Sequence, residues 1–152
     1  MDNRVYGYAR VSTREQNEDR QIEALKVYGV PEQNIIIDKA SGKDTEREGY
    51  QYLKRQILRN GDTLVIKELC RLSRNKNDIK RELEEFKKMG IRVKILDIPT
   101  TLTEFPPEQE WILDMINSIL IEVLGSIAEN ERMSKIAFTI SKNSKNRTSK
   151  KK

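Results

Sequence analysis

An arginine and a serine stand two residues apart where an apolar strand pattern gives way to a helical one. They are Arg10 and Ser12, within the segment 8–16. A helix start presents free backbone N–H groups and the positive end of a dipole, so it favours bound anions such as phosphate. Ser12 is therefore a candidate nucleophile. The spacing also fits a helix cap, and the two interpretations are compatible because Thr13 can cap while Ser12 reacts.

The amino-acid composition limits how such a serine could react. The chain has no histidine, which excludes a Ser-His-Asp triad, and a single cysteine, Cys70, which excludes an internal disulfide and metal sites built from cysteine and histidine clusters. Nearby arginines suit attack on phosphorus, because a guanidinium offers paired donors to phosphate oxygens and stays charged. Several arginines together can stabilise a pentavalent transition state electrostatically.

Short apolar runs alternate with amphipathic patterns along the first two thirds of the chain. This alternation predicts an α/β fold with a mostly parallel sheet of four to five strands and flanking helices. Three glycines, Gly29, Gly61 and Gly90, stand where helices should stop. The expected strands are 5–11, 35–37, 64–66 and 93–98, and the expected helices are 15–28, 50–57 and 79–89.

Polar clusters follow three of these strands, at 10–12, 38–47 and 71–74. Parallel sheets place their ligand sites outside the carboxyl ends of the strands, so we expect the clusters to converge there. Each cluster alone has a simpler explanation. Arg71 and Arg74 could form surface salt bridges, and the polar segment after Asp38 could be only a connector.

A long apolar-rich stretch follows Pro106 and Pro107. A helix over about 108–140 would run ~50 Å at 1.5 Å per residue, further than the preceding domain extends. We therefore expect a partner helix, most simply in a homodimer; the alternative is two shorter helices broken at Gly125 and folded back on the sheet. The apolar stripe consists of Ile112, Ile116, Ile119, Val123 and Ile127. The predicted organisation is an α/β catalytic domain over 1–105, a long dimerisation helix over 106–140 and a basic flexible tail over 141–152.

Basic charge is concentrated at the end of the chain. Residues 132–152 hold eight Lys or Arg and no Asp or Glu, whereas the other 131 residues hold 21 basic and 24 acidic side chains. A basic segment of this kind is typical of a polyanion partner such as DNA or RNA, although it could serve only solubility. No secretory signal and no apolar run of about 20 residues is present, so we expect a cytoplasmic protein without a membrane partner.

Four short motifs resemble the serine recombinases, the resolvase/invertase family of site-specific DNA recombinases. Each motif is weak alone, but four in this order are specific, and the resemblance covers roughly residues 4–140. The motifs are 7–13 with Gln16 and Gln21, 38–42 with Arg47, 71–74, and 129–132 on the long helix.

The resemblance implies a role for each matched residue. Ser12 would attack a DNA phosphodiester and form a 5′-phosphoserine link, with no metal and no other cofactor. Arg10, Arg71 and Arg74 would cradle the scissile phosphate, and Arg47 would reach it from a mobile loop. The implied partners are double-stranded DNA and further copies of the chain, as a homodimer that becomes a tetramer in synapsis. The supporting residues would be Tyr8, Gln16, Gln21 and Asp38 at the site, and Glu131 and Arg132 on the dimer helix near the site or the DNA.

The chain departs from the family pattern in two places. Cys70 stands where the family commonly has an aspartate, and we assign it no catalytic role. Many members continue into a helix-turn-helix domain, whereas a basic segment follows here, so we expect salt-sensitive binding with poor recognition of sites. Two rival functions remain open: a catalytically impaired DNA-binding or assembly module of the same fold, and a phosphoesterase acting on a smaller substrate.

Overall fold

The computed structural model describes residues 2–12, 16–40, 47–73 and 76–148. Four strands form one parallel sheet in the order β2-β1-β3-β4. The predicted α/β fold with a parallel sheet is thereby confirmed, with four strands in the described ranges. Their bounds are β1 Val5–Ser12, β2 Ile35–Ala40, β3 Thr63–Ile66 and β4 Arg92–Ile95.

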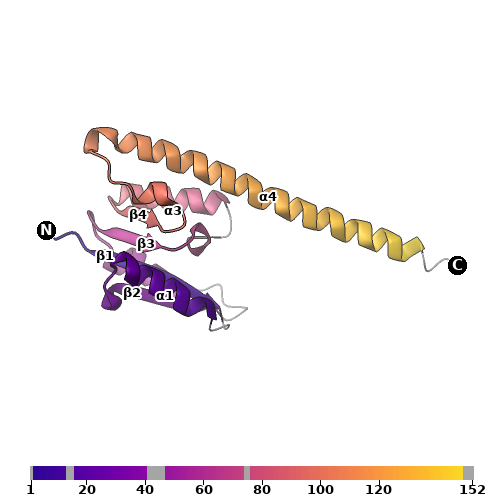
Figure 1. Ribbon diagram of the computed structural model, residues 1–152, viewed down its shortest axis with the longest axis horizontal. Helices are drawn as coiled ribbons and strands as arrows, with labels where there is room; N and C mark the ends of the chain where they lie inside the picture. The colour runs from indigo at the N-terminus through magenta and orange to yellow at the C-terminus, as the bar shows by residue number, and fades with distance from the viewer. Residues whose placement is uncertain (1, 13–15, 41–46, 74–75, 149–152) are drawn as a thin grey trace.

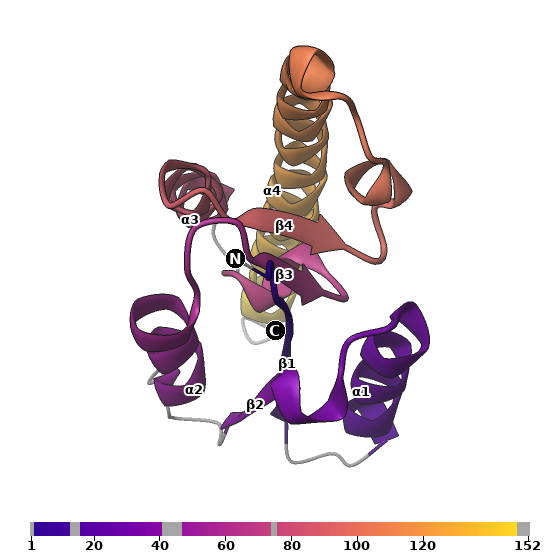
Figure 2. The ribbon, with the colours of Figure 1, turned by 90° about the vertical axis from the view of Figure 1, so that its left-hand side faces the viewer.

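Helices cover both faces of this sheet (Figure 1). Figure 2 shows helix α1 (Gln16–Tyr28) on one face, and helices α2 (Glu48–Tyr52) and α3 (Lys76–Lys88) on the other. A π-helical turn, Leu53–Ile57, continues α2. This two-sided cover explains why the strands read as continuous apolar runs.

Alternation along the central strands divides the buried side chains between the two faces. Tyr6 and Tyr8 of β1 belong to the core beneath α2 and α3, whereas Ala9 belongs to the core beneath α1. In β3, Leu64 and Ile66 lie in the first core and Val65 in the second. The larger core also contains Tyr50, Leu53, Leu58, Leu72, Phe86, Ile91 and Ile95.

Glycines end the helices that precede β2 and β4, as predicted. Gly29 and Gly90 have positive φ angles of 111° and 71°. After Gly29, Val30 N donates to Leu25 O at 3.0 Å, and after Gly90, Ile91 N donates to Phe86 O at 2.9 Å. These bonds close the helix ends by returning the chain toward the sheet, in a conformation that a side chain would strain.

The segment after β4 folds back along the outer edge of that strand. Thr101 is 1% exposed, and its hydroxyl accepts a hydrogen bond from Ile95 N at 2.8 Å. The same hydroxyl lies 2.7 Å from Ile98 O, to which it can donate. Arg92 Nη2 donates to Thr103 O at 2.8 Å. The side chains of Thr101 and Arg92 therefore hold the short 3₁₀ turn Pro99–Leu102 against β4.

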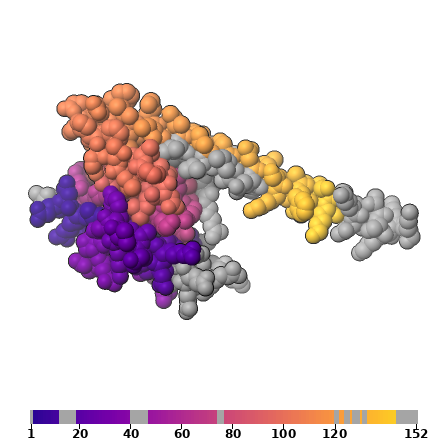
Figure 3. All heavy atoms as spheres, viewed as in Figure 1, coloured from indigo at the N-terminus to yellow at the C-terminus, as the bar shows by residue number. Residues whose placement is uncertain are grey.

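A single helix, α4 (Glu110–Thr148), completes the fold. At 1.5 Å per residue its 39 residues extend ~58 Å, and its outer part projects from the α/β body as an arm (Figure 3). The structure therefore has the one long helix predicted, and not two helices broken at Gly125.

The prediction of a flexible tail beginning at residue 141 is wrong over 141–148, where the helix continues. No proline or glycine follows Gly125 to end the helix before this point. Basic residues near the carboxyl end also interact favourably with the helix dipole. Residues 149–152 lie outside the described ranges.

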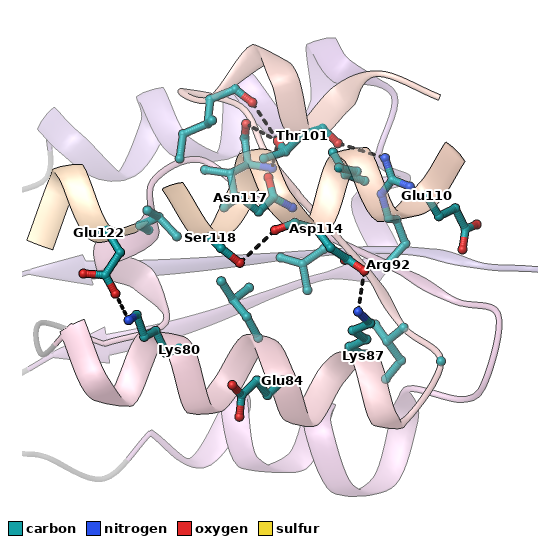
Figure 4. A pocket seen from close by; sticks show the side chains of 18 residues that line it. Lys80, Glu84, Lys87, Arg92, Thr101, Glu110, Asp114, Asn117, Ser118 and Glu122 are labelled. Atoms are coloured by element: carbon teal, nitrogen blue, oxygen red, sulfur yellow. Dashed lines mark hydrogen bonds and ion pairs between the residues drawn. The ribbon is translucent and has the colours of Figure 1, made fainter. Parts of the chain in front are cut away.

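The inner part of α4 meets the body at the β4 edge of the sheet. Leu113 is buried there, and two ion pairs, Lys80–Glu122 and Lys87–Asp114, join α4 to α3. They span a groove of about 560 Å³ between α3, β4 and α4 (Figure 4). A row of apolar side chains on α4 stays 49–62% exposed: Trp111, Met115, Ile119 and Val123. Within the described ranges, no helix is both long and apolar enough to cross a membrane.

Candidate active site

The strand order puts a topological switch point, here called the crevice, at the carboxyl ends of β1 and β3. These strands are neighbours, yet α1 follows β1 on one face while α3 follows β3 on the other. Sheets of this type bind ligands at such a reversal, because the helices diverge and leave the strand ends open. Ser12 is the last residue of β1, and Arg71 ends the 3₁₀ turn (Leu69–Arg71) that follows β3. Two of the predicted clusters therefore meet at this crevice.

The backbones of β1 and α1 place the residues around Ser12. Ser12 pairs in register with Ala40 of β2, and Gln16 begins α1. The side chain of Arg10, two residues before Ser12 on β1, is partly exposed. Predicted site residue Arg74 lies outside the described residues.

The side chain of Arg71 is tied to the end of β1. Its Nη1 donates to the carbonyl oxygen of Arg10 at 2.7 Å, and the buried Gln21 of α1 donates to the same oxygen at 3.1 Å. Nη2 of Arg71 lies 3.2 Å from a carboxylate oxygen of Glu68. Two acceptors, Arg10 O and Glu68, thus hold the guanidinium beside the strand that carries Ser12, and Gln21 shares the first of them. Arg71 and Gln21, both predicted as site residues, are brought together here.

Asp38 of β2 organises the other side of the crevice. Its carboxylate accepts three hydrogen bonds: from Tyr8 Oη at 2.8 Å, Gly49 N at 2.8 Å and Tyr50 N at 2.9 Å. The two amides belong to the first turn of α2, whose N-terminal flanking residue, Arg47, supplies no side-chain cap. Asp38 therefore caps α2 from a neighbouring strand and satisfies donors that the helix leaves free.

The hydroxyl of Tyr8 remains a donor over a wide pH range. The side chain is fully buried, and this burial raises the pKa of Tyr8 to about 12. A neutral phenol donates to the carboxylate of Asp38 without placing two negative charges together. Tyr8 thus supports Asp38, which fits the supporting role predicted for both residues.

Arg47 lies in the site, but its guanidinium is directed at the protein backbone. It stacks over the ring of Tyr50 at 3.8 Å, and its Nη2 donates to Arg71 O at 2.6 Å while Nη1 donates to Leu72 O. Nε lies 3.4 Å from Tyr8 Oη. In this structure Arg47 fastens the turn that carries Arg71. Each Nη still has a second N–H, so a further acceptor could bind.

The remaining predicted residues lie on a different element. Glu131 and Arg132 belong to α4, where the predicted long helix places them. Sequence reasoning missed Glu68, which contacts Arg71 directly. The available signal was the spacing of three residues between a carboxylate and a guanidinium at the end of a strand. In the described ranges, no three Cys, Asp or Glu side chains gather into a group suited to a metal ion.

Comparison with known proteins identifies the family of this chain. The family model described as the resolvase N-terminal domain matches residues 5–151. The chain is 44% identical over 94 residues to the Tn3 transposon resolvase of Escherichia coli, which covers 62% of this chain and 50% of that protein. It is 35% identical over 132 residues to a resolvase/recombinase of Pseudomonas putida, covering 86% of this chain and 66% of that protein.

A solved structure shares the fold. The N-terminal catalytic domain of TP901-1 integrase superposes with a TM-score of 0.57 at 28% identity, covering 86% of this chain and 98% of that one. The chain spans about half of the Tn3 resolvase and two thirds of the Pseudomonas putida protein. Because the family model matches nearly the whole chain, this protein belongs to the resolvase family of serine recombinases and contains its N-terminal domain.

Proposed function

We propose that this chain is the catalytic domain of a site-specific DNA recombinase that cleaves and rejoins DNA through a covalent 5′-phosphoserine at Ser12. The observation that carries this proposal is the fixed guanidinium of Arg71, which Arg10 O and Glu68 hold beside the end of β1. A cation held there suits a phosphate bound at the positive start of α1. The names of the relatives, resolvase and recombinase, favour DNA over a smaller phosphodiester.

In the proposed reaction the oxygen of Ser12 forms a bond to phosphorus as the bond to the 3′ oxygen breaks. The serine proton is lost and the 3′ oxygen leaves as a hydroxyl. The phosphoserine bond conserves the energy of the phosphodiester, so a 3′-hydroxyl can later attack the same phosphorus and rejoin the strand. Arg10, Arg71 and Arg74 would stabilise the charge on the pentavalent phosphorus, the role that metal ions have elsewhere.

The other predicted residues act around this centre. Asp38 and Tyr8 fix the start of α2, from which Arg47 braces the turn of Arg71. The second N–H of each Arg47 Nη would reach the phosphate. Gln21 holds the carbonyl of Arg10, and we assign Gln16 a similar supporting role. Glu131 and Arg132 would contact the site or the DNA from α4.

A second copy of the chain would cover the exposed apolar row on the inner part of α4. The apolar row that begins at Trp111 has no cover within the described part of one chain, and a second α4 is the simplest element to bury it. The basic segment 132–152 would lie against DNA. Exchange between two duplexes would then bring two such dimers together as a tetramer.

The test is a denaturing gel of duplexes that carry a nick, drawn from a mixed-sequence pool. Wild type should form a covalent adduct at the 5′ end, and Ser12→Ala should form none while keeping its fold by circular dichroism. Ser118→Ala is the matched control, because Ser118 is exposed on α4 and its hydroxyl donates to Asp114 O of its own helix. An adduct that persists in Ser12→Ala would refute the assignment of the nucleophile.

One observation favours a second function. Cys70 occupies the position where the family commonly has an aspartate, so the same fold could bind DNA and assemble without cutting it. That function predicts retention of DNA in a binding assay and no adduct on the nicked pool, even at high protein concentration.

A further inference from the structure

The turn after β3 is closed by Glu68 and Arg71 through both backbone and side chains. Arg71 N donates to Glu68 O at 3.1 Å, and Arg71 Nη2 donates to Glu68 Oε2 at 3.2 Å. Nη1 of the same guanidinium is already bound to Arg10 O. Two acceptors, one at each terminal nitrogen, therefore fix the plane of the group, and Glu68 is the charged one. Arg71 Nε remains without a hydrogen-bond partner in the described structure.

The neighbouring Cys70 cannot supply this anchor. Its thiol donates to Glu68 Oε2 at 3.1 Å, so it shares the acceptor that Arg71 uses. Although Cys70 is exposed, partial desolvation of its thiol and the hydrogen bond to Glu68 raise the pKa of Cys70, which keeps the thiol neutral and prevents it from attracting a guanidinium as a thiolate would. The hydrogen bond from Cys70 and the charge of Arg71 lower the pKa of Glu68, so its carboxylate is ionised at neutral pH.

We propose that Glu68 is a positioning residue for the phosphate-binding guanidinium of Arg71, and that it provides the carboxylate that Cys70 lacks. This inference rests on the proposed function, since it assigns Glu68 to the same site. A guanidinium held by an anion loses little conformational entropy when a phosphate binds, because folding has already fixed its orientation. The carboxylate at position 68 then makes a cysteine at position 70 compatible with cleavage.

The charge of Glu68 matters more than its size, because its surroundings are cationic. Lys67 Nζ lies 4.0 Å from Glu68 Oε1, on the side away from the oxygen that Arg71 contacts. Lys67 also pairs with Asp97 at 3.2 Å, which draws it toward β4. A neutral glutamine would leave the guanidinium with one neutral acceptor and a nearby lysine. We therefore expect Arg71 to rotate more freely in Glu68→Gln.

The first test measures the rate of the Ser12-dependent adduct at saturating DNA. Glu68→Gln should lower this rate by about 10- to 100-fold, the loss expected from a misplaced catalytic group, with DNA affinity changed by less than about 2-fold. Adding Cys70→Asp to Glu68→Gln should restore most of the rate, and Glu68→Asp alone should lose less than Glu68→Gln. Glu32→Gln is the matched control: it removes an exposed pair with Lys26 before β2, at the opposite end of the sheet.

The second test needs no catalysis. In arginine-labelled protein, the two Nη nitrogens of Arg71 should give separate NMR signals in wild type and merge in Glu68→Gln, with Arg59 signals unchanged. A wild-type rate in Glu68→Gln, an unchanged Arg71 spectrum, or no recovery with either aspartate would overturn the proposal. Absence of an adduct in wild type would instead refute the proposed function, and the NMR spectra would still decide whether Glu68 holds Arg71.

Discussion

Two carboxylates flank β1, one within β2 and one after β3, and their partners differ. Asp38, in β2, accepts hydrogen bonds from two backbone amides of α2 and from the buried Tyr8. Among the described residues, the carboxylate of Glu68, after β3, contacts side chains alone: the guanidinium of Arg71, the thiol of Cys70 and the more distant ammonium of Lys67. Its own side chain is 38% exposed.

The difference separates what folds the site from what orients its chemistry. Removing Asp38 would leave two backbone amides of α2 and the hydroxyl of Tyr8 without their acceptor, which lowers the free energy of unfolding. Removing Glu68 would free a side chain that solvent can still reach. We therefore expect the Asp38 side of the crevice to control the free energy of unfolding and the Glu68 side to control the reaction rate.

The largest effect should come from Asp38→Ala. Three donors lose their acceptor, and two of them are the free amides of a helix start, so the free energy of unfolding should fall by about 3 to 5 kcal/mol. Urea denaturation followed by circular dichroism measures it. Asp97→Ala, which removes only an exposed pair with Lys67, should cost less than about 1 kcal/mol. Equal losses in the two variants would contradict the capping role of Asp38.

Gly49→Ala should be the next most damaging change. A Cβ at this position would lie 2.5 Å from Asp38 Oδ1 and 2.9 Å from Ile36 Cγ2, so the expected loss is about 1 to 3 kcal/mol. Alanine normally stabilises a helix relative to glycine, so even the sign distinguishes this contact. In an Asp38→Ala background the penalty should shrink, because one of the clashing side chains is gone. Denaturation of all four proteins completes that cycle.

Tyr8→Phe should alter how stability depends on pH. Burial raises the pKa of Tyr8 from 10.0 to about 12, so folding favours the protonated phenol. This contribution is fully present below pH 10 and is lost as the pH rises toward 12. Wild type should therefore lose on the order of 2 kcal/mol more than Tyr8→Phe across that interval. Parallel curves for the two proteins would show that Tyr8 does not titrate in this way.

Glu68→Gln should have the smallest effect on folding. An ion pair at this exposure contributes little, so the free energy of unfolding should change by less than about 1 kcal/mol. The same variant is expected to slow adduct formation strongly. It should therefore change the reaction rate far more than the free energy of unfolding. A Glu68→Gln protein that unfolds as readily as Asp38→Ala would remove the distinction between the two sides.

The sequence was sufficient for features that depend on local pattern. Apolar alternation predicted the parallel sheet and both sets of flanking helices, and the stripe beyond Pro107 predicted one long helix. The order of four motifs predicted the family. These signals survive because each is repeated over many residues or across several segments.

Features that depend on long-range contacts could not be predicted. Nothing local shows that Asp38 caps α2, since eleven and twelve residues separate it from the amides that it accepts. Nor does the sequence show that Arg47, predicted to reach the phosphate, also donates to the backbone of a turn 24 and 25 residues away. Helix extension to Thr148 was missed because a polar, basic composition resembles disorder when packing and dipole effects are not considered.

The fastening of the segment after β4 has a consequence for how copies of this protein can associate. A short outer strand normally offers unpaired amides to a strand from another molecule, which is a common beginning of aggregation. Here the hydroxyl of Thr101 occupies the amide of Ile95, and Arg92 anchors the covering segment. Addition of a further strand is therefore hindered on the side of the sheet where α4 lies.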